Sequence, residues 1–357
     1  MQGCNHDIGF CPKMLSRAGL LWYNGTKERG VSMLAHKFEA LDQKISVLCL
    51  GTMNFGDTMT EEESFQVMDA FSQMGGNFID TARVYGAFGP NGHGASEKVI
   101  GHWMATRNNR ERLVIGTKGG HPPIEGERLN RLDKENLTSD LNESLEALAI
   151  KTIDIYWLHR DDPTRPVEDI LETLNGFVAS GKIRSFGTSN WTPERIAQAN
   201  EAAKRLGIMG FSANQPMWSL ADPVVMADKT MCKMDPETYR FHEANGMLCV
   251  PYTSQAKGFF PKMAAGGSAW LSGEARERYL SDHNLRLFEA TQKIARETGL
   301  SESAIALAFL TAQPNFSVSP IVGVSNMEQV DALREASNAR LTKDQLNRLL
   351  TLSGLTE

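Results

Sequence analysis

The chain has 357 residues, enough for one large α/β domain or two smaller ones, and 41% of them are hydrophobic. Its formal net charge of −6 and the absence of a Lys/Arg cluster argue against a nucleic-acid-binding protein. No run approaches the roughly 18 consecutive apolar residues of a membrane span, which argues against a membrane partner. The five cysteines include no CxxC pair and the histidines no HExxH spacing, so we expect a cytoplasmic protein without a bound metal.

Residues 1–35 stand apart from the rest of the chain as an N-terminal extension. Their apolar stretch, Ala18–Tyr23, is too short for the core of a signal peptide, and no small-residue cleavage site follows it. Met33 would serve equally well as a start. We expect residues 1–35 to be disordered, or an over-long start, with no part in the fold. The alternative is a tail that covers the lower face of the domain or a partner subunit.

From residue 36 onward, short apolar runs alternate with segments of helical apolar spacing. The first helix has a clear start signal, since Thr60 and Glu63 form a capping-box pair, and Ser96 is expected to cap the second. In chain order the predicted elements are strand Val47–Met53, helix Glu61–Met74, strand Asn77–Thr81, helix Ser96–Ala105, strand Leu113–Lys118, helix Thr138–Leu148, strand Ile153–His159, helix Val167–Ser180, strand Ile183–Thr188, helix Pro193–Leu206, strand Phe211–Pro216, helix Pro236–Asn245, strand Met247–Tyr252, helices Asn284–Thr298 and Glu302–Ala312, strand Ser317–Val324, and helices Met327–Ala336 and Thr342–Leu352.

Eight strands with helices between them are typical of an α/β (β/α)8 TIM barrel, here over residues 36–357 with a C-terminal helical extension. The alternative is a doubly wound open sheet, but no GxGxxG motif follows an early strand. The segment Thr253–Asp282 is long for a connection between a strand and a helix, so it is a candidate lid over the site.

Three of the predicted strands lead into reactive polar residues. Asp80 lies near the end of one strand and Tyr85 follows it, Lys118 ends the next strand and His159 ends a third. Residues just past the carboxyl ends of barrel strands lie where α/β barrels keep their chemistry. A lysine cation favours a phenolate, a carboxylate holds the lysine, and a histidine relays or orients a proton. Any one of the four is also explained as a polar strand end that meets solvent, but together they indicate a proton-handling set.

The sequence around these residues resembles the aldo-keto reductases, closest to their general-stress and potassium-channel β-like branch. The similarity covers about residues 36–352, and His36–Ile45 is similar to the family's hairpin, an N-terminal cap that closes the barrel bottom. The segments that carry it, in family order, are Leu50–Gly56, Asn77–Tyr85, Gly94–Trp103, Ile115–Gly119, Ile153–His159, Gly187–Asn190 and Ile321–Gln329.

The resemblance implies an NAD(P)-dependent oxidoreductase that reduces aldehyde or ketone groups of small substrates, or oxidises the alcohols, by hydride transfer. In that reading Tyr85 is the general acid or base, Lys118 lowers its pKa, Asp80 pairs with Lys118, and His159 orients the carbonyl or passes a proton. The residues implied to line the substrate pocket are Tyr85, His159, Phe55 and Trp218.

The resemblance also implies a cofactor site. Ser189, Asn190 and Gln215 would hold the nicotinamide carboxamide, Tyr252 would stack on its ring, and the loop 253–258 would wrap the pyrophosphate. The alternatives are that Ser189 and Asn190 cap the helix before Pro193 and that Tyr252 is a core residue. The full implied set is Gly51, Thr52, Met53, Asp80, Ser189, Asn190, Gln215, Tyr252, Thr253, Ser254, Gln255, Ala256, Lys257, Gly258, Gly323, Ser325 and Gln329.

One departure from the family pattern bears on the choice of cofactor. Many relatives carry Lys or Arg directly after the residue that matches Ser325, where it binds the 2′-phosphate of NADPH, but this chain has Asn326. NADP(H) remains favoured and NAD(H) possible. Two alternatives to a reductase stay open on the same barrel: a nucleotide-sensing regulatory subunit, and a redox-neutral sugar enzyme with retained NAD(H). The substrate and the oligomeric state stay open as well.

Overall fold

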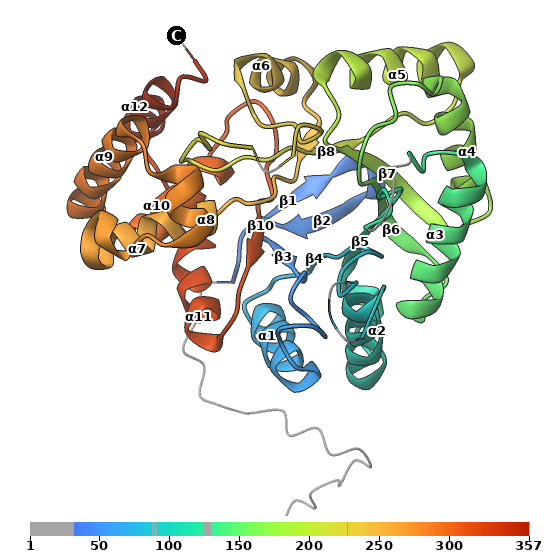
Figure 1. Cartoon of the computed structure of the whole chain (residues 1–357), viewed down its shortest axis with the longest axis horizontal. Helices are drawn as coiled ribbons and strands as arrows, with labels where there is room; N and C mark the ends of the chain where they lie inside the picture. The colour runs from blue at the N-terminus through green and yellow to red at the C-terminus, as the bar shows by residue number, and fades with distance from the viewer. Residues whose placement is uncertain (1–31, 88, 90, 125–129, 227, 357) are drawn as a thin grey trace, which may run out of the picture. The chain divides into compact units, whose positions relative to one another are not determined.

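The computed structural model describes residues 32–87, 89, 91–124, 130–226 and 228–356 (Figure 1). Ala35 opens the first strand, and Met33 is buried and donates its amide N–H to Met74 O at 2.7 Å. The fold therefore begins slightly before the predicted boundary, because residues 33–35 pack as part of it. Residues 1–31 of the predicted extension lie outside the described residues.

A β-hairpin closes the lower end of the barrel, as predicted. It pairs β1 (Ala35–Phe38) with β2 (Gln43–Ser46) in antiparallel register, across the short helix η1 (Glu39–Leu41). The apolar side chains of the hairpin share one buried cluster with the first residues of the barrel strands; the cluster includes Phe38, Leu41, Ile45, Phe78, Val114, Ile155 and Leu248. Since strand N-termini lie at one end of a parallel barrel, the hairpin plugs that end and leaves the opposite end for chemistry.

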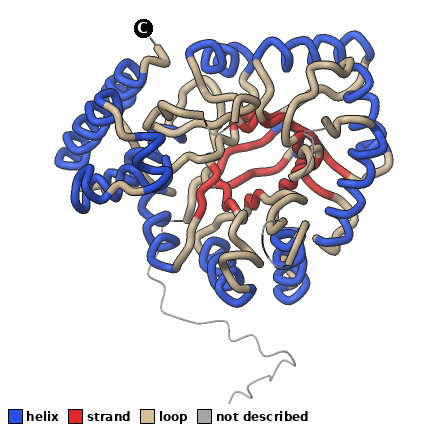
Figure 2. Tube along the Cα trace, in the orientation of Figure 1, coloured by secondary structure: helices blue, strands red, loops and turns tan. Residues whose placement is uncertain are grey.

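Eight parallel strands form the ring in the order β10-β3-β4-β5-β6-β7-β8-β9 (Figure 2). Cys249 N–H donates to Ser317 O at 3.0 Å and Ser319 N–H donates to Cys249 O at 2.9 Å, so the segment that leads into β10 pairs with β9 and closes the ring. The predicted (β/α)8 barrel is confirmed. The strands are β3 (Cys49–Gly51), β4 (Phe78–Asp80), β5 (Val114–Gly119), β6 (Ile153–Leu158), β7 (Ile183–Ser189), β8 (Ala213–Gln215), β9 (Leu248–Cys249) and β10 (Ile321–Gly323).

Helices surround the strands, and in the described ranges none is both long and apolar enough to cross a bilayer (Figure 2). The capping box of Thr60 and Glu63 is confirmed at α1, but Ser96 does not cap α2, because Gly94 takes that position with a left-handed backbone. The helices are α1 (Glu61–Gln73), α2 (Ala95–Arg107), η2 (Arg110–Arg112), α3 (Lys134–Ala147), α4 (Val167–Ala179), α5 (Pro193–Leu206), α6 (Pro236–Asn245), α9 (Asp282–Thr298), α10 (Glu302–Thr311), α11 (Met327–Ala336) and α12 (Lys343–Ser353).

The long connection Thr253–Asp282 is largely helical. It contains η3 (Ala256–Gly258), α7 (Phe259–Gly266), η4 (Gly267–Trp270) and α8 (Gly273–Tyr279). Its apolar side chains are anchored in the core, among them Phe259, Phe260, Met263 and Tyr279. The segment is therefore a packed cover, and movement as a lid stays a prediction.

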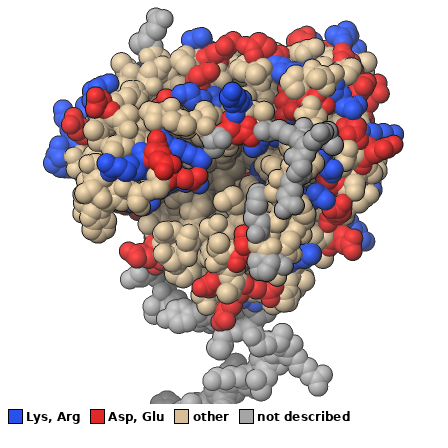
Figure 3. Space-filling model, in the orientation of Figure 1, with Lys and Arg blue, Asp and Glu red and all other residues tan. Residues whose placement is uncertain are grey.

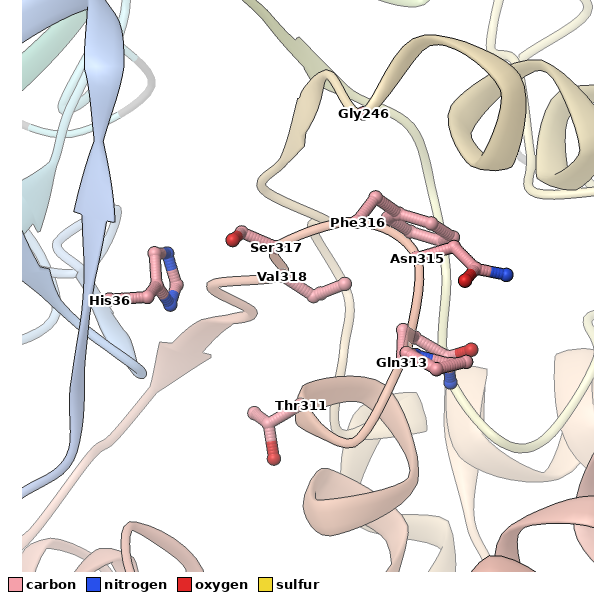
Figure 4. A pocket seen from close by; sticks show the side chains of 9 residues that line it. His36, Gly246, Thr311, Gln313, Asn315, Phe316, Ser317 and Val318 are labelled. Carbon is pink, nitrogen blue, oxygen red and sulfur yellow. The ribbon is translucent and has the colours of Figure 1, made fainter.

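A cavity of about 360 Å³ lies beside the hairpin, away from the strand ends that carry the reactive residues. Figure 4 shows His36 of β1 on one side and Phe316, Ser317 and Val318 on the other. Burial lowers the pKa of His36 to about 4, which keeps this ring neutral at physiological pH.

Two helix-interior glycines test how tightly the outer layer is packed. A Cβ on Gly101 of α2 would lie 2.7 Å from Leu148 O and 2.8 Å from Ala147 O, whereas a Cβ on Gly176 of α4 would meet nothing within 4 Å. We expect Gly101→Ala to lower the free energy of unfolding by about 1–3 kcal/mol through this clash. Gly176→Ala, the matched control, should raise it by about 0.5–1 kcal/mol. Urea unfolding measures both, and a Gly101→Ala variant as stable as Gly176→Ala would contradict the packing described.

Candidate functional site

The reactive residues predicted from the sequence meet at the carboxyl ends of three neighbouring strands. Asp80 is the last residue of β4, Lys118 lies near the end of β5, and His159 directly follows β6. Tyr85 sits in the turn that follows β4. The strands pair in parallel register, so their ends share one rim, and Figure 3 shows the molecular surface hollowed near the centre of the barrel view.

A buried ion pair organises this rim. Lys118 Nζ donates to Asp80 Oδ2, to Thr81 O at 2.8 Å and to Tyr85 Oη at 3.2 Å. The second carboxylate oxygen, Asp80 Oδ1, accepts from Gln215 Nε2 at 2.7 Å, across the barrel on β8. Asp80 is 1% and Lys118 4% exposed, so both charges depend on protein groups rather than on water. The ammonium thus joins the carboxylate to the phenol.

The charges at the rim set which groups carry protons. Burial alone would lower the pKa of Lys118, but attraction to Asp80 and Tyr85 outweighs it and raises that pKa. Burial raises the pKa of Tyr85, and the Lys118 cation acts against this rise, as the sequence analysis expected, without reversing it. Tyr85 is therefore a protonated phenol at neutral pH, held beside a permanent cation.

His159 stands next to the phenol as a neutral ring. Its ring lies edge-on to Tyr85, with centroids 6.3 Å apart, and edge-on to His121 at 4.7 Å. Burial, together with the charges of His121, Lys118 and Arg160, brings the pKa of His159 well below its ordinary value. Nδ1 of His159 is buried and makes no hydrogen bond within the described part of the chain. The imidazole is thus placed to hydrogen-bond an incoming polar group.

Four residues predicted to hold a nicotinamide are linked by their own hydrogen bonds. Asn190 Nδ2 donates to His159 O at 3.1 Å, and Asn190 Oδ1 accepts from Tyr252 Oη at 2.6 Å. Ser189 Oγ donates to Gln215 O at 3.0 Å. Gln215 Oε1 is buried and has no hydrogen-bond partner among the described residues. An unsatisfied buried acceptor at this position fits the N–H group of a bound carboxamide.

The loop that follows β9 has a backbone suited to an anion. Positive φ angles recur at Thr253 (56°), Ala256 (47°), Lys257 (54°) and Gly258 (77°). Two N–H groups are used within the loop, since Ala256 donates to Thr253 O at 2.9 Å and Gly258 donates to Gln255 O at 2.8 Å. Turns with repeated left-handed residues form concave backbone sites of the kind that bind anions, which fits the pyrophosphate that the family resemblance implies. The predicted charge of Lys257 is already engaged, since its Nζ pairs with Glu274 of α8 at 2.8 Å.

The same loop is fastened to the last strand. Ser254 Oγ donates to Ile321 O at 2.5 Å, and Gln255 Oε1 accepts from Gly323 N–H at 2.9 Å. The predicted pyrophosphate loop is therefore joined by direct hydrogen bonds to the strand that leads to the predicted adenosine end.

The predicted adenosine end lies at the start of α11. Asn326 Oδ1 accepts from Gln329 N–H at 2.9 Å and so caps the helix, while Ser325 N–H donates to Gln329 Oε1 at 2.8 Å. The residue that replaces the usual cation thus has a local structural role. The N-terminus of α11 supplies N–H groups that favour an anion, without a lysine or arginine at position 326.

Some predicted residues lie in packing positions. Phe55 is fully buried, and Trp218 is stacked on Phe316 in the core, so the structure gives both a packing role and their place in a substrate pocket stays a prediction. Thr52 Oγ1 donates to Asp80 O at 2.9 Å and accepts from Ser96 Oγ of α2 at 2.8 Å. Met53 is 57% exposed. A Cβ on Gly51 would lie 2.6 Å from Ile321 Cγ2, so β3 and β10 approach closely here.

A polar layer behind the rim was not predicted from the sequence. Thr81, Thr117, Ser96 and Glu97 are all fully buried and join β4 and β5 to the first turn of α2. Ser96 was expected to cap a helix, and Glu97 was noticed only as part of a family segment. The sequence signal for this layer was a pair of adjacent polar residues, Ser96 and Glu97, at the start of a helix that is otherwise apolar on the same face.

The ion pair makes a direct prediction about stability. Lys118→Met should lower the free energy of unfolding at pH 7 by about 3–5 kcal/mol, because it leaves the Asp80 carboxylate buried without its partner. Adding Asp80→Asn should recover part of that loss, since a neutral amide needs no counter-charge and can still accept from Gln215. Urea unfolding of both variants tests this. A double variant less stable than Lys118→Met would contradict the account.

Comparison with known proteins places the chain among oxidoreductases. A sequence model of the Aldo/keto reductase family matches residues 47–353. Norsolorinic acid reductase B of Aspergillus parasiticus is 29% identical over 323 residues, which span 86% of this chain and 80% of that protein. The uncharacterized oxidoreductase YrpG of Bacillus subtilis is 30% identical over 311 residues, 86% of this chain and 91% of that protein. The aryl-alcohol dehydrogenase [NADP(+)] of Phanerodontia chrysosporium is 28% identical over 330 residues, 85% of this chain and 82% of that protein.

The matched range contains Asp80, Tyr85, Lys118 and His159 as well as the whole ring of strands. The family resemblance inferred from the sequence is confirmed, while the narrower assignment to the general-stress and potassium-channel β-like branch stays a prediction. The protein is an oxidoreductase on a (β/α)8 barrel, and it belongs to the aldo/keto reductase family.

Proposed function

We propose that this protein reduces aldehyde or ketone groups of small molecules with NADPH, or oxidises the corresponding alcohols, with Tyr85 as general acid or base. The observation that supports this most is the contact of Lys118 Nζ with Tyr85 Oη inside the buried ion pair with Asp80. A phenol that is protonated at rest and faces a fixed cation donates its proton readily, because the phenolate left behind is stabilised at once.

Each of the four rim residues has its own role in the proposed reaction. Tyr85 Oη gives its proton to the carbonyl oxygen, Lys118 stabilises the phenolate, and Asp80 keeps Lys118 charged and in place. His159, as a neutral imidazole, hydrogen-bonds the same carbonyl oxygen and orients it. A nicotinamide cofactor, when bound, supplies the hydride. Positioning and preorganised charge would provide most of the rate increase.

The proposed cofactor site uses residues that are already held together. Gln215 Oε1, Ser189 and Asn190 would bind the carboxamide, and the left-handed backbone of the loop 253–258 would bind the pyrophosphate. Ser325 and Gln329 would meet the adenosine end at the start of α11. One relative is named as an aryl-alcohol dehydrogenase, so aryl aldehydes belong in the first panel of substrates to be tested.

Replacing Tyr85 tests the proposed chemistry. Tyr85→Phe should lower kcat for aldehyde reduction by about 10²–10⁴-fold, since proton transfer loses its donor, and should leave the Kd for NADPH within about twofold. Cofactor absorbance follows turnover, and nicotinamide fluorescence follows binding. Tyr239→Phe is the matched control, because it removes a hydroxyl that donates to Gln313 in the outer core. Binding of NADPH without turnover of any carbonyl would favour a nucleotide sensor, and no binding of either nucleotide would overturn the proposal.

The cofactor preference should depend on position 326. Asn326→Arg is expected to raise the ratio of Kd for NADH to Kd for NADPH about tenfold, because a charge-assisted contact to the 2′-phosphate is gained. Asn326→Ala is the control, since it removes the helix cap without adding a charge. Fluorescence titrations with both nucleotides measure the ratio. An unchanged ratio in Asn326→Arg would mean that the 2′-phosphate does not lie at the start of α11.

A further inference from the structure

The outer side of the strands that carry Asp80 and Lys118 is polar where a barrel is usually apolar. Ser96 Oγ, in the first turn of α2, donates to Thr52 O at 2.8 Å and lies 2.9 Å from Thr81 Oγ1. Glu97 Oε1 accepts from Thr117 Oγ1 at 2.5 Å. Two consecutive residues of α2 thus bind the ends of β3, β4 and β5 from behind.

These contacts lie one residue away from the ion pair. Thr117 immediately precedes Lys118, and side chains of successive strand residues point to opposite faces. Thr117 therefore faces α2 while Lys118 faces Asp80 inside the barrel. Thr81, which Ser96 contacts, offers its carbonyl oxygen to Lys118 Nζ at 2.8 Å. Hydrogen bonds from α2 to Thr81 and Thr117 therefore link the position of this helix to the Lys118 ammonium, which contacts Tyr85.

Glu97 is an unusual group to find in this layer. Its side chain is fully buried, and Oε2 has no hydrogen-bond partner within the described residues. Burial raises the pKa of Glu97 to about 7, although Thr117, Ser144 of α3, Arg83 and Lys118 all favour the carboxylate. The carboxyl thus changes charge in the physiological range, between a neutral acid and an anion placed behind β5.

A cavity lies against the residue that carries this carboxyl. It measures about 420 Å³ and opens between α2 and α3, on the outside of the barrel. Arg83, at the wall of the cavity, forms ion pairs with Glu143 at 2.5 Å and with Asp140 at 3.3 Å. Burial raises the pKa of Tyr156 of β6, and the negative charges of Asp140 and Glu97 raise it further. The residues that line the cavity are Arg83, His93, Gly94, Glu97, Lys98, Glu143, Glu146 and Ala147. Glu97 thus lies at the wall of a cavity that is separate from the rim.

We propose that Glu97 is a positioning residue for Lys118, which acts through Thr117, and that its charge state tunes how strongly Lys118 stabilises the Tyr85 phenolate. The inference rests on the reductase function proposed above. When Glu97 is neutral, the Lys118 cation is balanced by Asp80 alone and acts fully on Tyr85. When Glu97 is an anion, its negative charge offsets part of the Lys118 charge from the outer side of β5. The Tyr85 phenolate is then less stabilised, and proton donation by Tyr85 becomes harder.

The pH dependence of reduction tests this inference. With native protein, kcat should fall about two- to fivefold in a step centred near pH 7, as Glu97 ionises. Glu97→Gln keeps an oxygen for the Thr117 hydroxyl but cannot ionise, so its kcat should stay at the low-pH value across the step. Glu146→Gln is the matched control, because Glu146 lines the same cavity but is exposed, and it should retain the step. A step that persists in Glu97→Gln would overturn the inference.

A second variant separates positioning from folding. Thr117→Val keeps the shape of the side chain and removes the bond to Glu97, so kcat should fall about tenfold while the Kd for NADPH stays within about twofold. Equal losses in kcat and in the fraction of folded protein would mean a merely structural role and would overturn the inference.

A readout without turnover distinguishes failure here from failure of the proposed function. In protein with 13C-labelled tyrosine rings, the Tyr85 signal, assigned with Tyr85→Phe, reports the titration of its phenol. Glu97→Gln should shift that titration to lower pH, because an anion near Lys118 is removed. If native protein reduces no carbonyl yet this shift is present, the reductase proposal fails and the coupling stands. If turnover is present and the shift is absent, the coupling fails alone.

Discussion

The buried pair of Asp80 and Lys118 is the constraint on which the rest of the site depends. Two charges removed from water are tolerable only if each is compensated by close partners, and here the ammonium contacts a carboxylate, a carbonyl and a phenol. The partner of the other carboxylate oxygen, Gln215, comes from β8, on the far side of the ring from β4. The electrostatics of one pair thus fix the relative positions of strands that are distant in sequence, and those strands carry the groups that meet the substrate in the proposed reaction.

The two ends of the barrel follow different rules. At the lower end the hairpin fills the ring with apolar side chains, and the buried contacts there serve stability. At the upper end the same strands finish in charged and hydroxyl groups, which are costly to bury and are held by neighbours on both faces. Ser96 and Glu97, on the outer side of the strands, are likewise buried polar groups that neighbouring residues hold. They show that the helices around a barrel can take part in the electrostatics of its interior, not only in its packing.

The sequence predicted the fold well because strands buried on both faces read as apolar runs, and eight of them in alternation with helices leave few architectures. It also predicted the four rim residues, since strand ends are local features.

The sequence did not predict the features that depend on contacts between distant parts of the chain. The role of Ser96 was misjudged because the nearest strand ends are 15 and 44 residues away in sequence. The start of α3 was placed at Thr138 instead of Lys134 because its first turn is polar, and Phe55 and Trp218 gave no sequence sign of how deeply they pack.

The bonds that fasten the loop after β9 to β10 have one more consequence. Ser254 and Gln255 hold the backbone of Ile321 and Gly323, and β10 is the strand at which the ring of strands is completed. The loop after β9 therefore also stabilises the barrel at the place where β9 and β10 close the ring. Under the proposed function, an anion bound by this loop would lie beside the hydrogen bonds that tie the loop to β10, so ligand binding would also stabilise the closure of the ring.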